Sequence, residues 1–241
     1  KDYEQEPYLA LATKDGLVKK TALTEYDTNR TGGLIAINLR EGDELVSARL
    51  VDDEGELIMV SAKGMSVRFR ADQLRAMGRA TSGVRGMKFR PGDHTLAMGV
   101  VREGWDLVTV TEEGFAKRTD LAEWNTKGRA GFGVRAMKLV QERGSLVAAL
   151  VCQPEDTIFA IASNGVVIRT LVAQVRQTSR DTMGVSLMGL PAGVTVVAVA
   201  RSDAHEEEAE FEQDSDDSDP DSGSDHATGD DEESVESGNK E

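Results

Sequence analysis

Positively charged side chains recur along this 241-residue chain at a spacing near fifty residues. One set follows a turn glycine in each repeat and comprises Lys19, Lys20, Arg68, Arg70, Lys117, Arg118 and Arg169. A second set lies in or beside glycine-rich loops and comprises Arg30, Arg79, Arg85, Lys127, Arg129, Arg135 and Arg180. Ammonium and guanidinium groups neutralise phosphate, and loops without side chains let backbone N–H groups approach it. The two sets together predict a binding surface for a polyanion.

A simpler explanation applies to any single member of these sets. Lysine and arginine at exposed strand ends also keep proteins soluble and protect sheet edges from pairing with other chains. Recurrence at corresponding positions of four copies favours the binding surface for the set as a whole.

Recurring glycines indicate the elements that position these residues. Three markers advance together at Gly16, Gly64, Gly114 and Gly165, at Gly33, Gly83, Gly133 and Gly184, and at Gly42, Gly92, Gly144 and Gly193. The first marker advances by 48, 50 and 51 residues and each time separates two short apolar runs. Tandem units of this length with several strands each are typical of propeller blades. We expect an all-β β-propeller or β-pinwheel of about four four-stranded blades, in which recurring side chains trace a stripe around the rim.

The second copy illustrates one unit. Runs 44–51, 56–61 and 65–70 are separated by Asp- and Gly-containing turns and predict a three-stranded meander, followed by a fourth strand over 84–89. On this scheme the first copy lacks its opening strand, and the last ends with an unpaired starter strand over 194–201. Either the two ends close a ring, or further blades precede Lys1.

Charge divides the chain into two parts. Residues 203–241 contain 18 acidic residues and one lysine, whereas residues 1–202 contain 27 basic and 25 acidic residues, a net charge of +2. The tail also has a single aromatic residue, Phe211, so it cannot bury enough apolar surface to offset its ordering entropy. We therefore predict repeats over 1–202 and a disordered acidic tail over 203–241.

Enzymatic motifs are weak. The run 78–83 resembles the start of a phosphate-binding loop, but Val84 stands where lysine is needed. Run 128–133 has the wrong glycine spacing for a dinucleotide site, and His94, His205 and His226 are too few for a triad or a zinc site. Asp214 to Asp221 lacks the spacing of a calcium loop. We predict no catalytic residue, no metal, no cofactor and no small-molecule substrate for this chain.

The cellular setting follows from what the sequence lacks. Cys152 is the single cysteine, which excludes a disulfide framework and predicts a buried thiol in a reducing compartment. The sequence contains neither an apolar run approaching the about 20 residues of a membrane span nor a signal peptide. The expected location is cytoplasmic, without a membrane partner.

The arginine-glycine loops resemble those of the C-terminal domain of the DNA gyrase A protein, in a form like that of actinobacteria. The resemblance covers 1–202 through Asp15-Gly-Leu-Val-Lys-Lys, Gly78-Arg-Ala-Thr-Ser-Gly-Val-Arg, Gly114-Phe-Ala-Lys-Arg-Thr and Gly165-Val-Val-Ile-Arg-Thr. It implies a six-bladed β-pinwheel whose basic perimeter wraps duplex DNA. It also implies an A2B2 holoenzyme with the gyrase B protein in the bacterial nucleoid, which uses ATP and Mg²⁺ elsewhere to introduce negative supercoils.

Two features depart from that family pattern. The heptapeptide Gln-Arg-Arg-Gly-Gly-Lys/Arg-Gly is absent, although Lys127-Gly-Arg-Ala-Gly-Phe-Gly is a degenerate version with Phe132 in the basic position. The catalytic tyrosine is absent as well, so the resemblance implies a part of a topoisomerase without its upstream blades and catalytic core.

The leading functional hypothesis is sequence-independent binding and bending of duplex DNA, with the acidic tail modulating wrapping or merely improving solubility. Two alternatives remain. One is the C-terminal domain of the topoisomerase IV A protein, and the other is a protein-interaction propeller with no nucleic-acid role.

Overall fold

The computed structural model describes residues 7–29 and 31–202. The predicted acidic tail over 203–241 and the candidate site residue Arg30 therefore lie outside the described residues. The chain divides into two units, Lys1–Ala204 and His205–Glu241, and the fold concerns the first.

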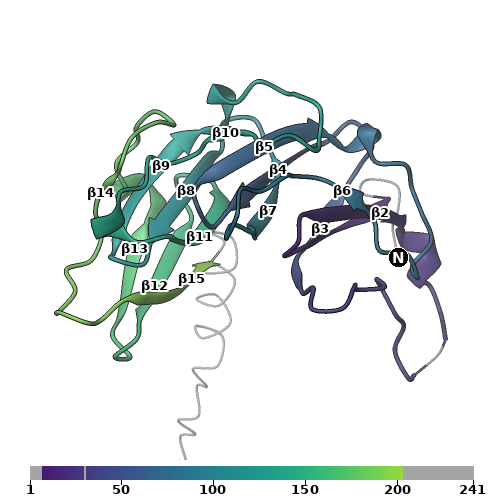
Figure 1. Cartoon of the computed structure of the whole chain (residues 1–241), viewed down its shortest axis with the longest axis horizontal. Helices are drawn as coiled ribbons and strands as arrows, with labels where there is room; N and C mark the ends of the chain where they lie inside the picture. Colours follow the sequence, from purple (N-terminus) through teal and green to yellow (C-terminus); the bar gives the residue numbers. More distant parts are fainter. Residues whose placement is uncertain (1–6, 30, 203–241) are drawn as a thin grey trace, which may run out of the picture. The chain divides into compact units, whose positions relative to one another are not determined.

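The described residues form four antiparallel sheets, which confirms the all-β prediction (Figure 1). The first sheet has the order β3-β1-β2-β6, with bounds Leu45–Val51, Tyr8–Thr13, Leu17–Ala22 and Val84–Arg85. The second has the order β7-β4-β5-β10, with bounds Thr95–Val101, Glu56–Ser61, Met65–Arg70 and Val134–Arg135. The third has the order β11-β8-β9-β14, with bounds Leu146–Cys152, Asp106–Thr111, Phe115–Asp120 and Val185–Ser186. The fourth has three strands in the order β15-β12-β13, with bounds Val196–Ser202, Thr157–Ala162 and Val167–Leu171.

Short 3₁₀ turns complete the repeats. Four of them follow the second strand of a hairpin: Leu23–Tyr26 (η1), Ala71–Gln73 (η2), Leu121–Glu123 (η3) and Val172–Gln174 (η5). The remaining one, Gln141–Arg143 (η4), precedes β11. No helix among the described residues is long and apolar enough to cross a membrane.

Neighbouring repeats exchange strands, which corrects the predicted meander. The strand before each hairpin pairs with the hairpin of the preceding repeat. β3 pairs with β1, not with β4, and β7 pairs with β4. The short fourth strand also belongs to the preceding sheet, because β6 pairs with β2, β10 with β5 and β14 with β9. The strand over 196–202 is therefore paired, with β12, and the incomplete sheet is the last one, not the first.

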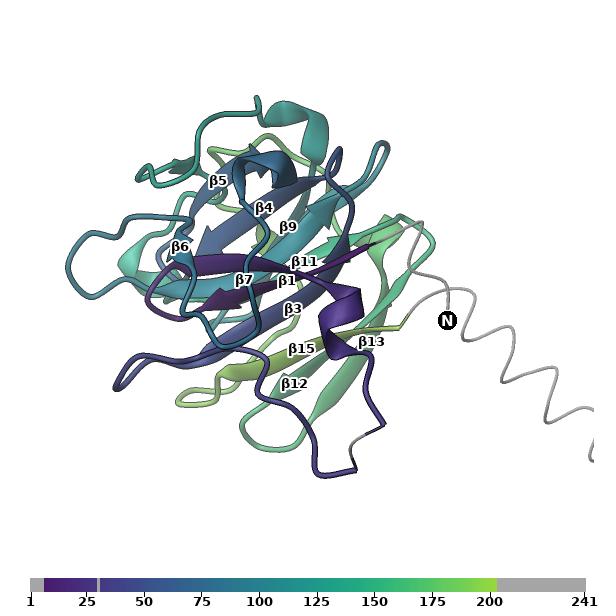
Figure 2. The same ribbon diagram turned by 90° about the vertical axis from the view of Figure 1, so that its right-hand side faces the viewer.

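The core lies between successive sheets. Along β4 the alternating side chains Leu57 and Met59 pack toward the first sheet, whereas Ile58 and Val60 pack toward the third. A strand with both faces buried needs a continuous apolar run, which explains why this segment does not alternate with polar residues. β3, β7, β11 and β15, the strands at one edge of each sheet, are successive neighbours. Figure 2 shows these strands from a second direction. Cys152 is buried in this core and forms no disulfide.

The glycine markers are sites of close backbone approach. Gly64 has a φ of +76°, and its carbonyl accepts a hydrogen bond of 2.8 Å from Ala136 N–H of the next repeat. Gly184 has a φ of +71°, and a Cβ atom there would lie 2.6 Å from the Ala116 carbonyl oxygen. Side chains are excluded at both positions, since φ is positive and the neighbouring backbone is too near.

Candidate nucleic-acid interface

The outer edge of the sheets carries the glycine-rich loops. We define the outer rim as β6, β10 and β14 together with the loops 78–83, 128–133 and 179–184. Each loop contains one half-buried arginine: Arg79, Arg129 or Arg180. Their guanidinium Nη1 atoms donate to the carbonyls of Ile35, Arg85 and Arg135, at 3.1, 2.9 and 3.2 Å. Each loop arginine thus ties its loop to the preceding repeat.

Five of the predicted cations are exposed: Arg70, Arg85, Lys127, Arg135 and Arg169. Arg70 pairs with Asp72 at 2.8 Å and Arg135 with Asp181 at 3.0 Å, in both cases with partly exposed side chains. Exposed pairs of this kind contribute about 0–1 kcal/mol, so a phosphate can replace the carboxylate at little cost. Arg85 and Lys127 form no ion pair within residues 7–29 and 31–202. Arg70, Arg85, Lys127 and Arg135 are therefore available to a polyanion.

Lys19 and Lys117 are fully buried, in contrast to the expectation of a displayed stripe. The Lys19 ammonium donates to the carbonyls of Ala36, Gly78 and Arg79 at 2.9, 3.0 and 2.6 Å. The Lys117 ammonium donates to those of Ser179 and Arg180, each at 2.6 Å. Burial lowers the pKa of Lys19 and lowers the pKa of Lys117 to about 8. These lysines hold the rim loops from below.

The next position along the strand carries Lys20, Arg68 or Arg118, and each has an acidic partner. Lys20 is buried, forms an ion pair with Asp53 and lies 4.5 Å from the centre of the Tyr8 ring. The hydrogen bond from Lys20 lowers the pKa of the Asp53 carboxyl.

The two arginines at this position are half-buried. Arg68 pairs with Glu56 and also donates to the Leu121 carbonyl at 2.8 Å. Arg118 pairs with Asp106 at 2.6 Å and donates to the Val175 carbonyl at 2.9 Å. Of the cations that follow the turn glycines, five therefore support the rim from within, because the loops that cover the strands bury or half-bury them: Lys19, Lys20, Arg68, Lys117 and Arg118.

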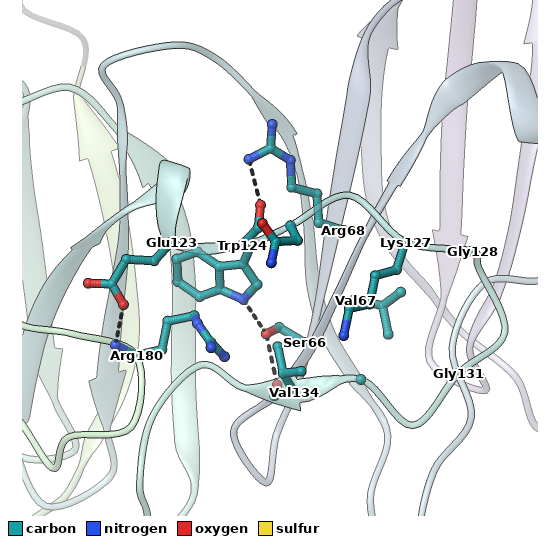
Figure 3. A pocket seen from close by; sticks show the side chains of 12 residues that line it. Ser66, Val67, Arg68, Glu123, Trp124, Lys127, Gly128, Gly131, Val134 and Arg180 are labelled. Atoms are coloured by element: carbon teal, nitrogen blue, oxygen red, sulfur yellow. Dashed lines mark hydrogen bonds between the residues drawn. The ribbon is translucent and has the colours of Figure 1, made fainter.

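The second sheet has a cavity of about 160 Å³ where the neighbouring sheets have a buried lysine. Val67 occupies the position of Lys19 and Lys117, so no ammonium lies under the loop 128–133. Figure 3 shows Trp124 between Ser66 and Arg180 in this cavity. The indole N–H donates to the Ser66 hydroxyl at 2.7 Å, and the Arg180 guanidinium lies 5.8 Å from the ring centre.

The loop 128–133 has a different backbone from its equivalents. Ala130 is the one non-glycine residue with positive φ, +64°, among the described residues. Its N–H donates to the Gly86 carbonyl at 2.6 Å. In the preceding repeat the equivalent carbonyl is that of Ala36, and it accepts a hydrogen bond from the Lys19 ammonium instead. The turn at Ala130 thus replaces the missing lysine.

Four exposed cations of this region were not predicted: Arg75, Lys88, Lys138 and Arg176. Lys88 and Lys138 follow the outer strands β6 and β10, and their N–H groups donate to the carbonyls of Gly131 and Thr182 at 2.9 and 3.0 Å. The sequence contains a pattern that could have predicted these two lysines, because each follows a methionine, Met87 or Met137, at the repeat spacing. Within residues 7–29 and 31–202, no cluster of His, Cys, Asp or Glu could hold a metal ion.

Tandem sheets that receive their outer strand from the next repeat define a protein of the β-propeller class, here with basic side chains along the outer rim. A family model described as DNA gyrase C-terminal domain, beta-propeller, matches residues 7–52, 55–102, 106–153 and 156–203. The chain belongs to this family.

The relatives agree with this assignment. The chain is 49% identical over 211 residues to the DNA gyrase A protein of Mycolicibacterium smegmatis, an alignment that covers 87% of the chain and 25% of the relative. It therefore spans about one quarter of the length of the curated relatives it matches.

Solved structures share the fold. A crystal structure of the C-terminal domain of DNA topoisomerase IV has a TM-score of 0.80 at 25% identity, covering 88% of this chain and 68% of the other. A structure of the DNA gyrase A C-terminal domain has a TM-score of 0.73 at 27% identity, covering 83% and 67%.

Proposed function

We propose that this chain binds and bends duplex DNA without sequence preference along the outer rim. The observation that supports this most strongly is the recurrence of exposed cations at equivalent places on successive sheets: Arg85 with Arg135, and Lys88 with Lys138. Side chains at equivalent places of tandem repeats follow a curve. Phosphates of a bent duplex can therefore be neutralised one repeat after another.

The energy needed to bend the duplex sets a minimum number of phosphate contacts. A smooth bend of a short duplex costs of the order of 1–6 kcal/mol, and each neutralised phosphate offsets part of that cost by releasing counterions. Arg79, Arg129 and Arg180 contribute by fixing the loops to the preceding repeat. Lys19, Lys20, Arg68, Lys117 and Arg118 contribute from within, through their hydrogen bonds to loop carbonyls and ion pairs.

The wider role rests on the family. In this proposal the chain wraps DNA for a gyrase-type topoisomerase, an A2B2 assembly of the gyrase A core with the gyrase B protein in the nucleoid. Strand breakage, ATP hydrolysis and Mg²⁺ binding belong to other parts of that assembly. Its supercoiling of relaxed plasmid in the presence of ATP distinguishes this role from that of a component of topoisomerase IV.

The test is the salt dependence of DNA binding, measured by fluorescence anisotropy with a labelled duplex. With about six phosphates neutralised, the slope of log K against log salt concentration is expected near −5. Arg85→Ala and Arg135→Ala should each make the slope shallower by about 0.9. Arg49→Ala is the matched control, because Arg49 lies on β3, at the opposite edge of the first sheet. A slope near zero contradicts the proposal.

A further inference from the structure

Two loops of the outer rim present an exposed apolar side chain. Phe132 is 51% exposed in the loop 128–133, and Met183 is 37% exposed at the equivalent place of the loop 179–184. Each lies immediately before the marker glycine of its repeat. Single exposed apolar side chains are common on protein surfaces, but these two recur at the same place of successive repeats. The recurrence indicates a role that the two loops share.

Each of these apolar residues lies beside an exposed lysine of the preceding repeat. The carbonyl of the residue before Phe132 accepts a hydrogen bond of 2.9 Å from the Lys88 N–H. The carbonyl of the residue before Met183 accepts one of 3.0 Å from the Lys138 N–H. Both lysines are exposed. Each loop thus brings one apolar residue and one cation together on the rim.

The remaining interface of this kind lacks both members of the pair. In the loop 78–83 the equivalent place holds Ser82. The N–H that donates to the residue before it, at 3.1 Å, belongs to Asn38. An apolar residue therefore occurs with lysine, and serine occurs with asparagine. Because the two positions are far apart in the chain but adjacent in the structure, their joint change indicates that the apolar group and the cation act as one unit.

Phe132 does not fill the cavity beneath its own loop. Gly131 and Gly133, on either side of it, line that cavity, whereas the Phe132 ring remains half exposed. The loop backbone is fixed, since the Ala130 N–H donates to the Gly86 carbonyl at 2.6 Å. Contact between the ring and a ligand therefore needs little prior ordering of the loop.

We propose that Phe132 and Met183 are wedges, which insert between neighbouring base pairs of the bound duplex from its minor groove. Lys88 and Lys138 neutralise the phosphates beside each insertion. This inference rests on the proposed binding of DNA along the rim. An apolar wedge unstacks a base step and kinks the duplex, and the additional contacts of the bent DNA offset the cost. The duplex is then kinked at discrete points one repeat apart.

A wedge favours any base step that unstacks easily, which gives the first measurement. Two duplexes of the same length, one fully paired and one with a central mismatched pair, are titrated with the 241-residue chain in fluorescence anisotropy. The mismatch has already lost part of its stacking, so wild type should bind that duplex about tenfold more tightly. The double substitution Phe132→Ser and Met183→Ser, which places serine as at Ser82, should reduce the preference to less than about twofold.

Leu50→Ser is the matched control. Leu50 is 45% exposed on β3, at the edge of the first sheet opposite to β6, so its loss removes an exposed apolar side chain away from the rim. This variant should keep the preference for the mismatched duplex.

The fully paired duplex separates a failure of this inference from a failure of the proposed function. If wild type binds it with a salt slope near zero, DNA binding along the rim is itself refuted. The doubly substituted chain has lost no charge, so its slope should differ from that of wild type by less than the about 0.9 of one phosphate contact. An unchanged slope also shows that this variant is folded.

The second measurement is the bend itself, from energy transfer between dyes at the two ends of the paired duplex at saturating protein. The ends should lie further apart with the doubly substituted chain than with wild type or Leu50→Ser. Equal binding of both duplexes by wild type, a preference for the mismatch that survives the double substitution, or equal energy transfer in all three proteins overturns the proposal.

Discussion

At the scale of single residues, side chains with the same charge have different roles. Arg85 is exposed on the rim, whereas Lys117 is buried beneath it and donates to two loop carbonyls. A buried ammonium without partners would be costly, so its carbonyl partners define its position. The basic residues of this chain consequently form two layers, one that faces solvent and one that supports it.

The pKa of Lys117 gives the first prediction. In the folded protein this lysine releases its proton at about pH 8 because of burial, against a usual value of 10.5. Between these values the unfolded chain binds more protons than the folded one, so the stability contribution of Lys117 increases as pH rises. The free energy of unfolding of wild type, relative to Lys117→Met, should increase by up to about 3 kcal/mol over that range.

Urea unfolding of both proteins at about pH 7.5, 9 and 10.5 measures this difference. A parallel pH dependence of the two curves would show that Lys117 titrates normally. At the lowest pH the variant leaves two loop carbonyls without their donor, which typically costs about 1–3 kcal/mol if they stay buried. The loss of these hydrogen bonds is present at the lowest pH, whereas the effect of Lys117 deprotonation appears as the pH rises, so measurements at several pH values separate the two.

At the scale of elements, strand boundaries were predictable and strand partners were not. Turn glycines such as Gly64 and Gly114 placed the central hairpins, and 56–61 and 65–70 are strands with the predicted bounds. The run over 45–51 would be equally apolar whether it paired with β1 or with β4, so the sequence does not specify the exchange. Val84–Arg85 is shorter than the predicted 84–89 because the chain then turns to meet the next loop.

The sequence also predicted the loops of the candidate site, but not which of its basic side chains are buried. Repeat spacing identified the loops that carry Arg79, Arg129 and Arg180, and the structure places all three beside the outer strands. Spacing does not tell a buried lysine from an exposed one, because burial of Lys19 and Lys117 depends on a loop some sixty residues away. DNA contact by these residues remains a prediction.

The loop 128–133 provides the second prediction. Left-handed backbone costs a non-glycine residue roughly 1–2 kcal/mol, and glycine avoids this cost but loses more entropy on folding. Ala130→Gly should therefore raise the free energy of unfolding by about 0.5–1 kcal/mol. Ala80→Gly, at the equivalent place in the preceding loop where φ is not positive, is the control and should lower it by a similar amount. Equal effects of the two substitutions, measured in urea, would refute the assignment of strain to Ala130.

At the scale of the whole molecule, charge is divided between repeats of slightly positive net charge and a strongly acidic sequence that follows them. The chain has a net charge of −15, but residues 1–202 have +2 and residues 203–241 the remainder. Overall acidity therefore does not argue against a DNA-binding role, since binding depends on the local potential over the rim.

The acidic segment gives the last prediction. If residues 203–241 compete with DNA phosphates for the basic rim at high effective concentration, salt should weaken this competition. A chain that ends at Ser202 should bind duplex DNA more tightly than the whole chain at low salt, and the two affinities should converge as the salt concentration rises. Anisotropy titrations of both chains across salt measure this, with a chain whose tail acids are replaced by Asn and Gln as the control for length. If truncation leaves the affinity at low salt unchanged, the tail acts only on solubility. If the neutral tail weakens binding as much as the acidic one, the effect is steric, because charge has then been removed without consequence.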